Sequence, residues 1–200
     1  MPRIVDYDRV RDRMLAAGFV SLYHNAGAFG FPRGADVNTL GWIGLDDGTI
    51  RAEVRPFVRA VPRPHASHLA GMLVSARRHL PRDVWLMPKS HWHFELHDGH
   101  PELLASLLPE IGIDAALLRE RNDGSAIAFA AEEDDRLRHT IERLLDGMRQ
   151  SDFLLAFPDA AADAGTRAVC TIHHHKQLWW QTTSAALIKQ LEDQSTQSST

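Results

Sequence analysis

The sequence contains a single cysteine, few lysines and no long apolar run. Cys170 alone excludes an internal disulfide and a cysteine-based zinc knot, which agrees with a reducing compartment, and we expect it to be a buried thiol. No stretch reaches the roughly 18 uninterrupted apolar residues of a membrane helix, and the charged first residues lack the apolar core of a signal peptide. These absences predict a cytoplasmic protein that has no membrane partner.

Basic residues are also fewer than acidic residues. The 22 Lys and Arg residues face 26 Asp and Glu residues, which gives a formal net charge of -4. A general positive field that could hold nucleic acid is therefore missing, and we expect no nucleic-acid partner. The glycine-rich segment 23–38 does not have the spacing of a phosphate-binding loop, so no nucleotide cofactor is indicated. We interpret this segment as a structured loop that Phe29 and Phe31 pin to the body of the protein.

Helical and strand-like patterns alternate along the chain. The helical period predicts helices at 7–17, 65–80, 101–112, 132–149 and 184–192. Short apolar or alternating runs predict a hairpin at 39–61 with its turn at Asp47-Gly48, and strands at 83–88, 89–100, 125–131, 152–158 and 168–183. Helices mixed with such strands indicate an α+β fold, in which helices pack on a mixed or antiparallel sheet.

Two parts of the chain repeat a similar order of elements. The segments 83–88 and 152–158 each follow a predicted helix, begin with Asp, end with Pro and precede a histidine-bearing segment. The order β, α, β, β, α thus occurs twice, and a recurrence at roughly 70 to 80 residues suggests a duplicated β-α-β-β module. We predict one globular α+β domain over 1–190, with halves 40–115 and 116–190, followed by a disordered polar tail at 191–200.

Residues 89–100, KSHWHFELHDGH, are the most unusual stretch of the sequence. If they form a half-buried strand, His91, His93, Glu95 and His97 share one face, and the apolar residues between them occupy the other. Side chains two apart on a strand project about 6.6 Å apart, which lets two imidazoles converge on one ion. The row spans roughly 20 Å, so a third ligand has to come from elsewhere.

The predicted strand 168–183 offers that third ligand, because His173 and His175 share one of its faces. The resulting candidate ligands for a divalent zinc, iron or manganese ion are His91, His93, Glu95, His173 and His175. Two histidines plus a carboxylate with open positions suit catalytic zinc or non-haem iron. The competing interpretation is that these histidines are structural or solvated.

The scarce lysines lie beside both histidine clusters. Lys89 precedes His91, and Lys176 follows His175, so both are candidates for binding a small anionic substrate. We therefore predict a hydrolytic enzyme that acts on such a substrate, with His93, Glu95 and His173 as its catalytic residues. Homo-oligomerisation stays open.

The layout also resembles that of the 2H phosphoesterases, two-lobed enzymes of about this length that carry one His-x-Thr/Ser strand in each half. The segment HWHFELHDGHPELLASL looks like such a strand running into a helix, and His93 and His173 have a suitable separation. The hydroxyl residues of the motif are missing, because Glu95 and His175 stand in their places. The resemblance implies a metal-free phosphodiesterase in which His93 and His173 act as acid and base.

A third hypothesis is a non-catalytic binding or assembly module that presents tryptophan and histidine to a partner. An enzyme predicts that the histidine faces of the two halves converge on a concave site. An assembly module predicts that these faces lie apart, and an exposed Trp179 or Trp180 on an edge strand would favour it.

Overall fold

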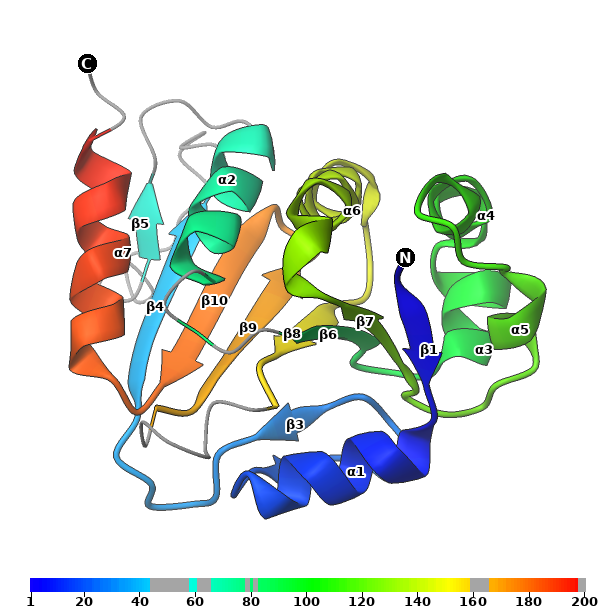
Figure 1. Cartoon of the computed structure of the whole chain (residues 1–200), viewed down its shortest axis with the longest axis horizontal. Helices are drawn as coiled ribbons and strands as arrows, with labels where there is room; N and C mark the ends of the chain where they lie inside the picture. Colours follow the sequence, from blue (N-terminus) through cyan, green and yellow to red (C-terminus); the bar gives the residue numbers. More distant parts are fainter. Residues whose placement is uncertain (44–57, 61–65, 78–79, 81–82, 159–165, 198–200) are drawn as a thin grey trace.

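The computed structural model describes residues 1–43, 58–60, 66–77, 80, 83–158 and 166–197 (Figure 1). The turn predicted at Asp47-Gly48 lies outside these residues. None of the helices in the described ranges is long and apolar enough to cross a membrane.

The centre of the fold is an eight-stranded sheet with the order β1-β7-β6-β8-β9-β10-β4-β5 (Figure 1). Its strands are β1 (Arg3–Val5), β4 (Asn38–Ile43), β5 (Val58–Ala60), β6 (Val84–Pro88), β7 (Ala126–Phe129), β8 (Phe153–Ala156), β9 (Ala168–His173) and β10 (Gln177–Thr182). All neighbours pair antiparallel except β4 and β5, which pair in parallel. The mixed sheet confirms the predicted α+β class.

Helices cover the sheet on both sides. They are α1 (Tyr7–Ala16), α2 (Ala66–Arg77), α3 (Trp92–Phe94), the π-helical turn η2 (Glu95–Gly99), α4 (Pro101–Glu110), α5 (Ala116–Arg119), the 3-10 turn η3 (Ala131–Glu133), α6 (Asp134–Gly147) and α7 (Ala185–Gln197). Figure 1 shows α2 and α6 above the sheet and α7 upright at its left-hand end, whereas α1 and the small hairpin β2 (Val20–Ser21) and β3 (Phe29–Gly30) lie below it.

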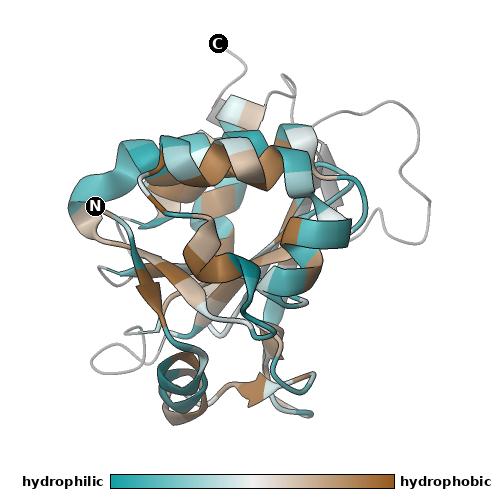
Figure 2. Ribbon diagram, turned by 90° about the vertical axis from the view of Figure 1, so that its right-hand side faces the viewer, coloured by the Kyte–Doolittle hydropathy of each residue, from teal (hydrophilic) through white to brown (hydrophobic). Residues whose placement is uncertain are grey.

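Alternation along the strands produces two separate cores. In β6, Leu86 packs with the core of α2, α4, α6 and α7, while Trp85 and Met87 pack with α1 on the opposite face. Such alternation follows from the two-residue period of a strand, and it explains why central strands read as continuous apolar runs. Figure 2 shows that hydrophobic residues gather where helices meet the sheet. Phe29 is buried in the second core and Phe31 packs against it, so both pin the glycine-rich loop as expected.

The predicted disordered tail at 191–200 is wrong for most of its length, because α7 continues to Gln197. Leu187 and Leu191 are four residues apart and both are buried in the core shared with α2. An apolar pair at this spacing lies on one helix face, so its burial extends the helix into a polar segment.

The predicted histidine strand at 89–100 is also wrong. β6 ends at Pro88, and the chain then forms α3 and η2. His91 caps α3, since its Nδ1 accepts a hydrogen bond from the backbone N–H of Phe94 at 3.1 Å. Trp92 is fully buried, and its indole N–H donates to the carbonyl of Ser125 at 2.6 Å. Over so short a stretch, burial of Trp92 and Leu96 fits a helical period as well as strand alternation.

This correction also removes the basis for the duplicated module. The first half places a helical turn where the second half has the strand β9. The second half contains β7, α6, β8, β9, β10 and α7, so the order β, α, β, β, α is not repeated and the duplication is not confirmed.

Candidate functional site

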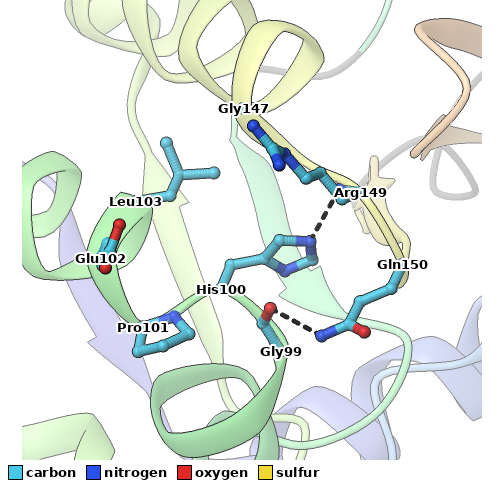
Figure 3. Close-up of a pocket in the computed structure, with 8 residues that line it drawn as sticks. All are labelled: Gly99, His100, Pro101, Glu102, Leu103, Gly147, Arg149 and Gln150. Carbon is cyan, nitrogen blue, oxygen red and sulfur yellow. Dashed lines mark hydrogen bonds between the residues drawn. The ribbon is translucent and has the colours of Figure 1, made fainter.

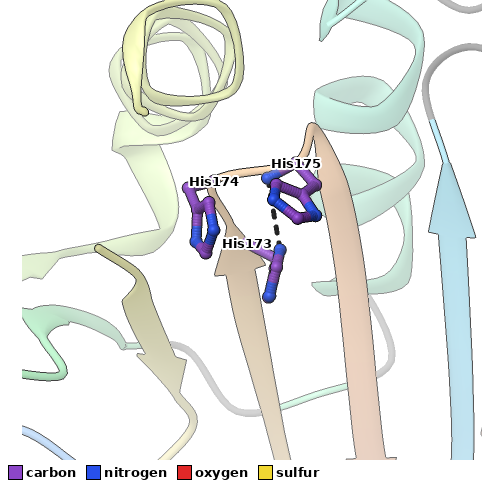
Figure 4. A group of neighbouring side chains, drawn as sticks. All are labelled: His173, His174 and His175. Carbon is purple, nitrogen blue, oxygen red and sulfur yellow. Dashed lines mark hydrogen bonds between the residues drawn. The ribbon is translucent and has the colours of Figure 1, made fainter. Parts of the chain in front are cut away.

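Three consecutive histidines lie where β9 turns into β10 (Figure 4). β9 ends at His173 and β10 begins at Gln177, so what was predicted as one strand is a tight hairpin. Lys176 adopts a positive φ of 59° in the turn, a conformation typical of such connections. One ring nitrogen from each of His173, His174 and His175 lies within 4.8 Å of the others. Because the turn breaks the alternation, all three rings gather at one place.

Asp152 orients the middle histidine of the triplet. Its Oδ1 lies 2.8 Å from His174 Nδ1 and also accepts the backbone N–H of His174 at 3.1 Å. Nδ1 therefore carries the ring proton in the neutral form, and Nε2 keeps its lone pair. A histidine that gives its other N–H to a carboxylate in this way is the usual metal ligand or general base.

Lys89 completes the charge arrangement beside the triplet. Its backbone N–H donates to the carbonyl of Asp152 at 2.9 Å, and its ammonium lies 3.8 Å from the Asp152 carboxylate. This closeness follows from the pairing of β6 with β8 and of β8 with β9. The sheet thus places the lysine of one histidine segment next to the histidines of the other.

The electrostatics of the site reflect its partial burial. Burial by itself raises the pKa of the Asp152 carboxyl, but the hydrogen bond from His174 and the charges of His173 and Lys89 outweigh it. Its pKa therefore lies below its usual value. Burial also lowers the pKa of His173, and the attraction of Asp152 only partly offsets this effect. His173 is thus held in its neutral form more readily than a free histidine.

His173 differs from His174 in its hydrogen bonding. Its Nδ1 accepts the backbone N–H of His175 at 3.2 Å, which leaves the ring proton on Nε2. The rings of His173 and His174 are stacked with centroids 4.3 Å apart. For His173 to bind a metal ion, it has to give up the hydrogen bond from His175.

Glu95 and the first histidine cluster do not join the triplet. Within the described part of the chain, no other group of three His, Cys, Asp or Glu side chains reaches comparable spacing. His91 serves as a helix cap, and His93 is exposed with its Nδ1 3.2 Å from the carbonyl of Arg119. Lys176 lies in the turn, but its ammonium faces the carboxylate of Asp146 at 3.7 Å.

Glu95 is instead the centre of a buried hydrogen-bond network. It is completely buried, and its carboxylate accepts from the hydroxyl of Ser90, from the hydroxyl of Ser151 at 2.7 Å and from His100 Nδ1 at 2.9 Å. Three donors compensate the loss of water around a buried carboxylate. Ser90 follows Lys89 and Ser151 precedes Asp152 in the chain, so this network fixes the backbone next to both charged residues of the site.

A cavity of about 430 Å³ adjoins this network (Figure 3). It is lined by Gly99, His100, Pro101, Glu102, Leu103, Gly147, Arg149 and Gln150. His100 Nε2 accepts the backbone N–H of Arg149 at 3.1 Å, and the Gln150 amide donates to the carbonyls of Asp98 and Gly99. None of the residues that the sequence predicted for the site lines this cavity.

Sequence reasoning missed Asp152, His174, Ser151 and His100. His174 was not among the predicted residues, because on a continuous strand it faces away from His173 and His175. The available signal was the run His-His-His-Lys itself, since four polar residues between two apolar runs indicate a hairpin turn. Nothing in the sequence indicated that Asp152 would face this turn, because β8 precedes β9 by a separate connection.

Comparisons with protein-family models, with curated proteins and with solved structures found no match for this chain. The fold also offers little support for the likeness to 2H phosphoesterases. That likeness required His93 on a strand, whereas His93 lies in α3.

Proposed function

We propose that the protein is a hydrolytic enzyme that acts on a small anionic substrate at the β9–β10 turn, with a divalent metal ion bound by the histidine triplet. The observation that carries this proposal is the Asp152–His174 pair inside a group of three imidazoles. Imidazole nitrogens are common ligands of zinc and iron. His174 is the main ligand in this proposal, and His173 and His175 complete the set.

Each residue around the turn has a separate role in this proposal. The metal ion would supply a bound water of lowered pKa and polarise the bond to be broken. Asp152 fixes the tautomer of His174 and leaves its Nε2 as the ligand atom. Lys89 neutralises charge on the substrate, because its ammonium is partly exposed beside the triplet. Lys176 is a weaker candidate, since it already faces Asp146.

The proposal no longer uses His93 and Glu95 as catalytic residues. His93 has no hydrogen bond or ring contact with the triplet in the described ranges, and the oxygens of Glu95 are occupied by buried donors. Its carboxylate is therefore better suited to support the site than to bind an ion or substrate.

A metal-free hydrolase is the second candidate, and the hydrogen bonding of the stacked pair favours it. His174 Nε2 has a free lone pair, whereas His173 Nε2 carries a proton. His174 Nε2 can therefore serve as general base for hydrolysis of a phosphodiester, and the Nε2–H of His173 can donate a hydrogen bond to the substrate; His173 acts as general acid only after it takes up a second proton. Here His174 replaces His93 as the partner of His173.

The deciding experiment is metal analysis by plasma mass spectrometry on untagged protein that has been incubated with zinc, iron or manganese and then desalted. Wild type is compared with His174→Ala and with His24→Ala, a matched control at an exposed histidine in the loop between β2 and β3. The same samples are assayed against chromogenic phosphomonoester, phosphodiester and carboxylate ester substrates, with and without a chelator.

The outcomes separate the hypotheses. Loss of one bound metal equivalent together with hydrolysis in His174→Ala, but not in His24→Ala, supports the metal-dependent enzyme. Hydrolysis that resists the chelator and still requires His174 supports the metal-free enzyme. If neither bound metal nor hydrolysis is detected, the result favours the binding or assembly module. That third hypothesis gains little from the tryptophans, because Trp180 is buried and β10 lies between β9 and β4.

A further inference from the structure

The exposed side of the turn formed by α3 and η2 carries two histidines four residues apart. His93 and His97 are both exposed, and their ring centroids lie 4.4 Å apart with an interplanar angle of 39°. Side chains four apart on a helical segment are neighbours on its surface, and in a π-helical turn they lie close to one full turn apart. The two imidazoles therefore stand next to each other above the protein surface.

The hydrogen bonding of these rings leaves donor atoms for a ligand. His93 Nδ1 lies 3.2 Å from the carbonyl of Arg119, so Nδ1 carries the ring proton and Nε2 keeps a lone pair. An imidazole whose other nitrogen donates to a backbone carbonyl is the common arrangement for a metal ligand. In the described ranges the His97 side chain forms one ring contact, with His93, and no hydrogen bond, so either of its nitrogens is available.

We propose that His93 and His97 form a second binding site for a divalent transition metal ion of the zinc, nickel or copper type. These ions favour imidazole nitrogens, and water fills the positions that the two rings leave open. His91 is not a ligand, because its Nδ1 accepts the N–H of Phe94 and its ring lies 6.5 Å from that of His93. Glu95 is not a ligand either, because it points into the buried network.

This site is independent of the function proposed for the triplet. The buried hydrogen bond between Glu95 and His100 stabilises the helical turn, while the imidazoles of His93 and His97 project outward from the same turn. A rigid turn presents both rings without the entropic cost of ordering a loop. The site can therefore bind a metal ion whether or not the β9–β10 turn holds one.

The test is calorimetric titration of untagged protein with Zn²⁺, combined with NMR spectra of the histidine ring nitrogens. Variants are His97→Gln, His93→Gln, His174→Ala and the control His24→Gln, an exposed histidine that has no ring contact with another histidine in the described residues. The expected result is that His97→Gln and His93→Gln each lower the affinity of one zinc equivalent by tenfold or more. This equivalent stays in His174→Ala and in His24→Gln, and the Nε2 signal of His93 shifts on its saturation.

Two results would overturn the second site. One is that His97→Gln binds zinc with the same stoichiometry and affinity as wild type. The other is that the equivalent disappears in His174→Ala, which would assign all binding to the triplet. Circular dichroism spectra of each variant exclude loss of folding as the cause, because both rings are exposed and their substitution leaves the buried residues in place.

Discussion

The two histidine-rich segments of this protein look alike in sequence and differ in structure. After β6 the chain winds into a helical turn, buries Glu95 and leaves His93 and His97 outside. After β9 the chain reverses in a hairpin and gathers three imidazoles beside Asp152. The comparison teaches that the residue types set the available chemistry, whereas the neighbouring elements decide which nitrogens and oxygens are free to use it.

The largest expected effect is on stability, and it tests whether Glu95 is a structural residue and not a ligand. Glu95→Ala leaves His100 and two serine hydroxyls without their acceptor in the interior, so the free energy of unfolding should fall by roughly 3 kcal/mol. Urea denaturation measures this change. Glu102→Ala, at an exposed glutamate of the next helix, is the control and should change stability by less than about 0.5 kcal/mol. If both variants are equally stable, the network is not a structural element.

The second prediction tests whether Asp152 is what distinguishes the triplet. Asp152→Asn removes the carboxylate that holds His174, and loss of such a partner typically lowers metal affinity by about 10- to 100-fold. Competition with a chromogenic chelator measures the affinity for zinc. Both variants carry His97→Gln as well, so that the measured affinity is that of the triplet. Asp146→Asn is the matched control, because Asp146 faces the same turn through Lys176. Equal affinities in the two variants would contradict the role of Asp152.

The third prediction concerns the cap that makes the first segment helical. His91→Ala removes the acceptor for the N–H of Phe94 and should cost about 1 kcal/mol in unfolding free energy. His91→Asn supplies another acceptor at the cap and should recover most of the loss. Thermal and urea unfolding give both values. An Asn variant that is no more stable than the Ala variant would show that the cap is not what His91 contributes.

The smallest expected effect is a change in the pH dependence of stability. The pKa of His173 is lower in the folded protein than its usual value of 6.5, so the unfolded chain binds the proton more readily. The contribution of His173 to stability is present above that value and is lost as the pH falls through the folded pKa. Urea unfolding at several pH values below neutrality should therefore show a shallower dependence in His173→Gln than in wild type or His24→Gln. Identical slopes would rule out this linkage.

Much of the fold could be predicted from local patterns. The helices at 101–112 and 132–149 were identified because burial on one face imposes a clear period on their apolar residues. The strands at 83–88 and 152–158 were identified as short, continuous apolar runs, which are typical of strands buried on both faces. The prediction was wrong for 89–100, where alternation over a few residues fits two periods. A hydrogen bond from Phe94 to His91 and the anchoring of Trp92 at Ser125 decide between them, and both depend on contacts formed by the folded chain.

The sequence predicted the residue types of the candidate site, but not all of the residues that form it. His173, His175 and Lys89 were named from the sequence, and the sheet brings them into one region. Asp152 and His174 could not be paired in advance, because their contact requires β8 to lie beside β9 and β9 to end in a turn.

By itself, the sequence determined the α+β class, the burial of Cys170 and the presence of two histidine clusters with a lysine next to each. Only the tertiary structure decided that Glu95 is buried among three donors, that His174 is oriented by Asp152 and that His93 and His97 stand together on the surface. The physical reason is that hydrogen bonds to side chains depend on strand order and helix capping across long separations in the chain, which no local pattern of residues encodes.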